Sequence, residues 1–235
     1  MTTLVSLISL LAFLLVVLPG PLYQYGVVEL TSAFTALRYG VYVGIAALVL
    51  LLLYIIIKRN KTRWLTAGVS AALAIVAIAL PVSMMQKAKS VPPIHDISTD
   101  LINPPAFVAV AALRAGAANP LEYAGEATAK QQREAYPELV TQRYSQSAEQ
   151  VFAAAEAAVN SSGMTAVNVD KALGIIEATD TTVWFGFKDD VIIRISNTGE
   201  QRLLDIRSKS RLGKSDLGKN AERIRSLLAD INANL

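Results

Sequence analysis

Cysteine is absent from this 235-residue chain, and histidine occurs once, at His95. The lack of cysteine excludes disulfide bonds, thiolate metal sites and a cysteine nucleophile. The sequence also lacks a Gly-x-Ser-x-Gly nucleophile elbow, a phosphate-cradling glycine loop and a dinucleotide-binding fingerprint. We therefore predict no cofactor and no metal.

Acidic residues are almost missing from the N-terminal part. Residues 1–90 hold seven of the 22 Lys and Arg residues but one of the 19 acidic residues, Glu29, which leaves 15 basic and 18 acidic residues in the remainder. The pI of about 9.1 therefore arises from the N-terminal part. Because the remainder is slightly acidic, the composition argues against nucleic acid as a partner.

Charge is also missing from three apolar runs, at 3–18, 39–57 and 64–85. About 20 apolar residues in a helix cross a hydrocarbon core of roughly 30 Å. The first run is shorter and needs residues 22–28 as well. It has neither a basic start nor a cleavage site, so we favour a retained helix over a removed signal peptide. The sequence thus predicts a membrane anchor over 1–90, with transmembrane helices at about 3–24, 39–57 and 64–85.

The basic loop Lys58–Arg63 predicts the orientation of these helices, because short cytoplasmic loops are rich in Lys and Arg. It places the N-terminus in the cytoplasm and everything after Met85 outside. Lys87 and Lys89 argue mildly against this orientation, but they are outnumbered. We predict a multi-pass protein of the inner (plasma) membrane with a periplasmic or otherwise exported C-terminal domain.

Residues 91–137 begin with a proline-rich segment that cannot be helical. Its apolar residues, among them Ile94, Ile97 and Phe107, favour a segment pinned along a domain over a loose tether. Two short helices are predicted to follow, at 106–118 and 122–136.

Residues 138–235 predict an α+β domain. Strand patterns lie at 139–144, 164–169, 175–187, 191–196 and 202–211. The capping-box pattern Ser147–Gln150 begins a helix that stops near Gly163. A closing helix is predicted over 216–231. This order indicates an antiparallel sheet of about five strands covered by helices.

Five ordered motifs support a family resemblance. They are His95–Asp100, Asn103–Phe107, Tyr136–Pro137, Trp184–Val191 and Asp205–Asn220. With them the chain resembles the bacterial and plastid domain of unknown function 1499, from about His95 to Leu235. The resemblance supports the domain limits and implies no activity.

The candidate catalytic residues are His95, Asp96 and Asp100. A triad would also need a serine such as Ser208 or Ser210. One imidazole with two loop carboxylates matches no tight metal-site spacing. A lone histidine beside prolines is more often structural. A membrane-bound hydrolase or transferase using His95 with nearby carboxylates is therefore the alternative hypothesis.

The strand at 202–211 carries the second group of candidates. Alternation places Asp205, Arg207, Lys209 and Arg211 on one face. These charges either pair with acidic groups inside the domain or bind a phosphate or carboxylate. Ser215 caps the last helix, and the helix start could also hold an anion. The candidate ligand- or anion-binding residues are Arg194, Arg207, Arg211, Ser215 and Arg223.

Together these features favour a non-enzymatic envelope protein whose exported domain binds an amphiphile or an anionic group, or supports a membrane assembly. Its expected partners are the lipid bilayer, together with a lipid headgroup or another membrane protein subunit. Trp184, Phe185 and Phe187 either line an apolar pocket between the sheet and a helix or belong to the core.

Overall fold

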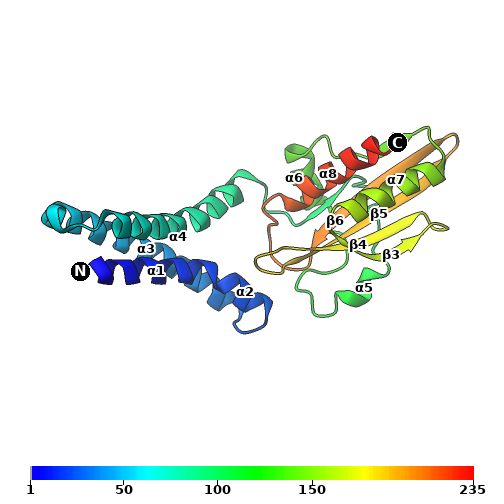
Figure 1. Ribbon diagram of the computed structural model, residues 1–235. Helices are drawn as coiled ribbons and strands as arrows, with labels where there is room; N and C mark the ends of the chain where they lie inside the picture. The colour runs from blue at the N-terminus through cyan, green and yellow to red at the C-terminus, as the bar shows by residue number, and fades with distance from the viewer. Residues whose placement is uncertain (1) are drawn as a thin grey trace. The chain divides into compact units, whose positions relative to one another are not determined.

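The computed structural model describes residues 2–235. The chain forms two compact units. The first comprises the residues up to Lys89 together with Val183–Gly186, and the second comprises Ser90–Thr182 and Phe187–Leu235. Figure 1 shows the elements of each unit.

The first unit contains the apolar helices α1 (Thr2–Val17), α2 (Pro19–Gln24), α3 (Leu30–Lys58) and α4 (Trp64–Ser90), with a short 3-10 turn at Arg59–Lys61. Three stretches of the described residues are long and apolar enough to cross a membrane: Thr3–Gln24, Leu30–Lys61 and Trp64–Ser90. The helix α3 begins at Leu30, well before the uncharged run, because Leu30–Leu37 continues its apolar face.

Small residues allow the helices of this unit to pack closely. Gly40 of α3 lies against Val16 of α1, and Gly44 lies against Ala74 of α4. A Cβ at Gly40 would fall 2.5 Å from a Val16 methyl group. Such small-residue contacts let helix backbones approach in an apolar environment, where dispersion rather than the hydrophobic effect drives association.

Val183–Gly186 is a loop, although the sequence pattern predicted a strand through residue 187. The strand β4 ends at Thr181, and β5 begins at Lys188. Within the first unit, Trp184 Nε1 donates to the Val17 carbonyl at 3.0 Å, and Phe185 is 3% exposed. These two aromatic residues thus pack with the apolar helices and not in the core of the sheet.

The second unit is built on one antiparallel sheet, in the order β1-β6-β5-β4-β3, with β2 also paired to β6. The strands are β1 (Asp96–Ser98), β2 (Gln142–Tyr144), β3 (Thr165–Asp170), β4 (Ile175–Thr181), β5 (Lys188–Thr198) and β6 (Gln201–Ser210). The predicted α+β class is confirmed. The sequence pattern missed β1, which lies in the proline-rich segment and pairs with β6 over Arg207–Lys209.

Helices α7 (Ala148–Ser161) and α8 (Lys219–Ala233) lie side by side across one face of the sheet (Figure 1). The predicted capping box is confirmed, since Ser147 Oγ accepts from the Gln150 amide and the Gln150 side chain accepts from the Ser147 amide. Fully buried apolar side chains such as Ile193, Ile206 and Ile224 fill the space between the helices and the sheet and form the core. These side chains supply the hydrophobic free energy of the fold.

The opposite face of the sheet is covered by residues 99–125, which we call the covering segment. It contains only one short helix, α5 (Val110–Leu113), where a longer one was predicted. Phe107 and Val110 of this segment bury Ile192 of β5. Helix α6 (Glu126–Ala135) follows, and its Gln132 side chain exchanges two hydrogen bonds with the backbone of Ser98 on β1.

Candidate functional site

Successive residues of β6 point to opposite faces of the sheet, as the alternation predicts. Leu204 and Ile206 lie in the core beneath α7 and α8. Asp205, Arg207 and Lys209 point the other way, and each is at most 3% exposed. The charged face of this strand is therefore buried beneath the covering segment.

One carboxylate, Asp96 on β1, binds two of these cations. It accepts from Arg207 Nε and Nη2, both at 2.9 Å, and from Lys209 Nζ at 2.9 Å. The Arg207 guanidinium also lies 5.0 Å from the centre of the Phe107 ring and 5.4 Å from that of Tyr123. We call these five residues the Asp96 cluster. Cation–π contacts of this kind are strongest where water is excluded.

Burial changes the proton affinities of two groups in the Asp96 cluster. It lowers the pKa of Lys209, because the charged ammonium loses its hydration, while the neighbouring Asp96 partly offsets this effect. Burial raises the pKa of Tyr123 from 10.0 to about 12, and the negative charge of Asp96 adds to the increase. Tyr123 therefore keeps its proton to a higher pH than an exposed tyrosine does.

A second carboxylate, Asp190 on β5, organises the neighbouring part of the same face. It accepts from Arg114 Nη1 at 2.6 Å, from Arg211 Nε and Nη2 at 2.9 and 2.8 Å, and from Thr179 Oγ1 at 2.8 Å. The adjacent Asp189 points to the opposite face, as strand geometry requires. The two aspartates thus serve different clusters and do not form a carboxylate pair.

A third group joins Arg194 to two carboxylates. Its Nη2 donates to Asp100 at 2.9 Å and to Asp205 at 2.8 Å. The Arg194 side chain is 29% exposed. Among the residues that the structure describes, its Nε and Nη1 have no hydrogen-bond partner. Arg194 therefore has donors to spare, but the two carboxylates beside it give the group a net negative charge.

Glu177 of β4 fixes the covering segment to the sheet. Although fully buried, it accepts from the backbone amides of Val108 at 2.8 Å and Ala109 at 2.7 Å. A buried carboxylate with such donors avoids most of its desolvation cost. The segment is thus held by ionic and hydrogen-bonded contacts as well as by Phe107.

Ser215 and Asp216 occupy the turn before α8, which begins at Lys219 and not at the predicted Asp216. Gly218 holds the N-cap position, so the prediction that Ser215 caps this helix was wrong. Ser215 Oγ accepts from the Leu217 amide at 3.3 Å, and the Asp216 carboxylate accepts from the amides of Gly218 and Asn220 at 2.8 and 2.7 Å. Burial raises the pKa of Asp216. The amides of Leu217, Gly218 and Asn220 are thus already bound by side chains.

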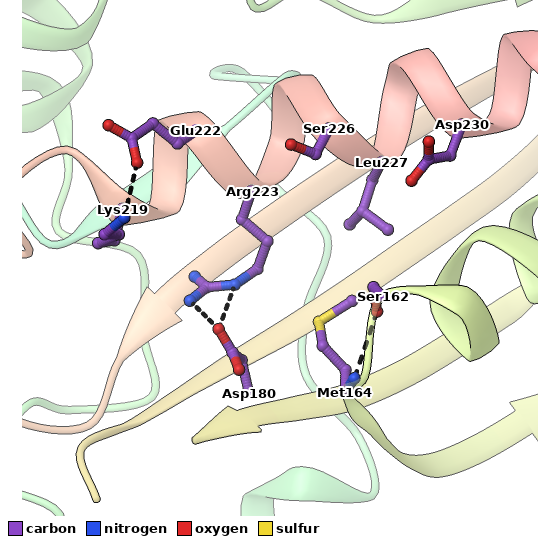
Figure 2. A pocket seen from close by; sticks show the side chains of 9 residues that line it. All are labelled: Ser162, Met164, Asp180, Lys219, Glu222, Arg223, Ser226, Leu227 and Asp230. Atoms are coloured by element: carbon purple, nitrogen blue, oxygen red, sulfur yellow. Dashed lines mark hydrogen bonds and ion pairs between the residues drawn. The ribbon is translucent and has the colours of Figure 1, made fainter. Parts of the chain in front are cut away.

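Arg223 of α8 reaches the helix-covered face of the sheet, where all five of its N–H donors have partners. Nε and Nη2 donate to Asp180, Nη2 also donates to Asp189 at 2.8 Å, and Nη1 donates to Ser208 and Asn220. Figure 2 shows the guanidinium directed from α8 toward Asp180 on β4. Arg223 thus ties the last helix to the sheet.

A hollow of about 310 Å³ lies beside Arg223. Leu227 and Met164 give it an apolar side, while Lys219 and Glu222 form an ion pair at its rim, at 2.9 Å (Figure 2). Of the five candidate anion-binding residues, Arg223 lines this hollow, and the other four line neither it nor the other hollows of the described chain that are named below.

The candidate catalytic residues are not assembled. The His95 ring contacts the Lys214 carbonyl at 3.4 Å, whereas Asp96 points to the opposite face and Asp100 accepts from the amides of Ile102 and Asn103. Within residues 2–235, no group of three or more His, Cys, Asp or Glu side chains is placed to hold a metal ion.

Sequence reasoning did not identify Arg114, Glu177 or Tyr123. Arg114 is the one charged residue of an alanine-rich stretch, and a single charge among apolar residues indicates that its side chain is buried with a partner. Glu177 interrupts an apolar strand between Ile176 and Ala178, which again indicates a specific partner. Neither pattern identifies the partner, because the bonded groups lie far away along the chain.

The architecture defines an α+β protein with three apolar N-terminal helices. The chain belongs to the family described as "Protein of unknown function (DUF1499)", whose model matches residues 96–231. A comparison with curated proteins finds no match.

Proposed function

We propose that this protein is a non-enzymatic component of the bacterial cell envelope, anchored in the inner membrane, whose α+β domain supports a membrane assembly. The observation that carries the proposal is the internal neutralisation of the domain's charged groups. Asp96, Asp190 and Asp205 bind the cations of β6 and its neighbours at low exposure. Such a network favours a rigid body over a reactive site.

The three apolar helices support the anchor, and the basic residues between α3 and α4 support its orientation. Lys58 is the last residue of α3, and Arg59, Lys61 and Arg63 lie in the short connection that includes the 3-10 turn. By the positive-inside rule this connection is cytoplasmic, and the α+β domain is exported.

Because the chain has no cysteine, single cysteines test this topology directly. Lys61→Cys and Glu200→Cys are matched probes, since both side chains are exposed and neither belongs to the partner contact proposed below. In intact cells, a membrane-impermeant maleimide is expected to label the cysteine at position 200 and not the one at position 61. The opposite labelling pattern would reverse the proposed orientation.

Anion binding by the arginines receives less support than assembly. The donors of Arg223 are all bound, and four of the five donors of Arg207 and of Arg211 are bound as well. An anion would have to displace carboxylates that are already in place. For catalysis, no carboxylate of the described residues forms an ion pair with the His95 ring, which contacts the Lys214 carbonyl, so His95→Ala is expected to leave the function of the protein intact.

Exposed apolar residues of the covering segment are the proposed contact with an assembly partner. Ile102 is 97% exposed, and Val108 and Leu113 are each more than half exposed. Ile102→Asp should dissociate the assembly, whereas Leu173→Asp, in the turn between β3 and β4, should not. Mass photometry of the full chain in mild detergent measures the mass of the assembly formed by each variant. A wild-type protein that is monomeric under these conditions would contradict the proposal.

Amphiphile binding is a second candidate, favoured by a hollow of about 490 Å³ at the start of α7. Phe152, Leu173 and Ile195 give it an apolar side, and Lys171 lies at its rim. In this test Leu173→Asp should lower lipid binding, because Leu173 lines the hollow, and Ile102→Asp is the control. The two variants thus exchange the roles that they have in the assembly test. Lipid bound to the purified full chain is measured by mass spectrometry. Equal lipid in both variants would exclude this hollow.

A further inference from the structure

The first unit contains an open hollow between α1 and α3, of about 620 Å³. Leu11 and Leu15 of α1 and Ala36 of α3 supply its apolar side, and Ser32 and Tyr39 supply hydroxyl groups. A hollow with this lining has the two chemistries of a lipid, an apolar length and a polar end.

Arg38 does not line the hollow itself, but it lies beside Tyr39, which does, and so brings a positive charge to the edge of the hollow. Its guanidinium lies 5.8 Å from the centre of the Tyr39 ring, and the side chain is not buried. Within the described residues, no carboxylate lies within ion-pair distance of Arg38. The single acidic residue of the N-terminal helices, Glu29, lies nine positions earlier, about 13 Å along the helix axis.

The position of Arg38 along α3 places it at the level of lipid headgroups. Arg38 and Lys58 bracket the uncharged run, and at 1.5 Å per residue they lie about 30 Å apart. This matches the roughly 30 Å thickness of the hydrocarbon core. With Lys58 at one boundary of the core, Arg38 lies at the other. Helical side chains also lean toward the N-terminus, so Arg38 and Tyr39 extend toward the headgroups.

We propose that the hollow between α1 and α3 binds one anionic phospholipid. Its phosphate pairs with Arg38 and accepts hydrogen bonds from the Ser32 and Tyr39 hydroxyls, the glycerol backbone lies beside Ala36, and an acyl chain lies against Leu11 and Leu15. An unpaired guanidinium at the edge of the hydrocarbon is costly, and a lipid phosphate removes this cost. Thr35 does not take part, because its hydroxyl donates to the Thr31 carbonyl at 2.7 Å.

The proposal rests on the membrane anchor proposed above, and it is tested on the full chain. The protein is reconstituted in nanodiscs of phosphatidylcholine with phosphatidylglycerol, then released for native mass spectrometry. Wild type is expected to retain one phosphatidylglycerol. Arg38→Gln is expected to lower the retained fraction at least fivefold, and Ala36→Phe, which fills the hollow but keeps the charge, should lower it as well.

Arg59→Gln is the matched control, because it removes one positive charge from the other end of α3. It should retain the lipid as wild type does. Equal loss in Arg59→Gln and Arg38→Gln, or full retention in Arg38→Gln, would overturn the site. Carbonate extraction of cell membranes distinguishes failure of the lipid site from failure of the proposed membrane anchor. If Arg38→Gln keeps the lipid and stays in the membrane, the site alone is wrong, whereas extraction of the wild type would overturn both proposals.

Discussion

Arg207 and Asp96 form a two-point ion pair, Nε to Oδ1 and Nη2 to Oδ2 at 2.9 Å each, in which neither side chain is more than 3% exposed. The two residues lie on adjacent antiparallel strands, and Lys209 binds the same carboxylate. One buried anion thus balances two buried cations. The carboxylate of Asp96 is therefore the counter-charge of both cations.

Asp96→Asn is expected to destabilise the domain by about 3–5 kcal/mol, because it leaves two buried cations without their counter-charge. Hydrogen–deuterium exchange of β5 and β6 in the full chain, in detergent micelles, measures the free energy of opening of these strands. The matched control is Glu126→Gln, which removes an exposed carboxylate paired with Arg133. That change should cost less than about 1 kcal/mol. Similar costs for both variants would contradict a structural role for the Asp96 cluster.

Tyr123→Phe is expected to leave stability unchanged or to increase it slightly. The Tyr123 hydroxyl is buried and has no hydrogen-bond partner within the described part of the chain, so its removal deletes an unsatisfied polar group. Tyr144→Phe is the matched control, since that hydroxyl donates to Asn232 at 2.9 Å. Its loss should cost about 1 kcal/mol. Urea unfolding of the full chain in micelles compares the two, and a larger cost at Tyr123 would imply a bound partner there.

Alkaline pH should destabilise the domain partly through Tyr123. Between pH 10 and about 12 an unfolded tyrosine has lost its proton, whereas folded Tyr123 keeps it, because burial raises its pKa to about 12. The unfolded state then binds fewer protons, so stability falls as pH rises through this window. Solvent screening limits the effect to at most about 2 kcal/mol, because the ring is only half-buried. The loss between pH 10 and 12 should be smaller in Tyr123→Phe, and equal losses would refute the assignment.

Local patterns predicted the parts of this fold that depend on neighbouring residues. The capping box at Ser147 and the two faces of β6 follow from hydrogen-bond geometry and strand alternation alone. Local patterns did not predict the strand β1, because a three-residue strand beside prolines has no periodicity of its own. It exists because β6 supplies its partner, more than 100 residues later.

The candidate site shows the same division. The pattern identified Arg207 and Arg211 and the face that they share, but it could not show that this face is covered. That depends on Glu177, which binds the covering segment through three backbone amides. Which charged residues bind one another in a buried ionic network is decided by the packing of the sheet. A single sequence therefore identifies the charged residues of the network but not their partners.

Gly174→Ala should destabilise the domain through two separate effects. Gly174 has φ +67°, a left-handed conformation that costs an L-residue about 1–2 kcal/mol. A Cβ there would also lie 2.3 Å from the Ile195 carbonyl oxygen, whose residue donates its amide to the Gly174 carbonyl at 2.8 Å. Backbone cannot yield as a side chain can, so we expect a further loss of about 1–3 kcal/mol.

Gly116→Ala separates these two effects. Gly116 has φ +81°, and a Cβ added there would meet no described atom within 4 Å, so its substitution reports the conformational cost alone. Urea unfolding of the full chain in micelles should give a loss of about 1–2 kcal/mol for Gly116→Ala and a clearly larger one for Gly174→Ala. Equal losses of stability in the two variants would mean that the turn between β3 and β4 moves away from β5 at little cost. The hollow beside Leu173 would then be able to change its shape.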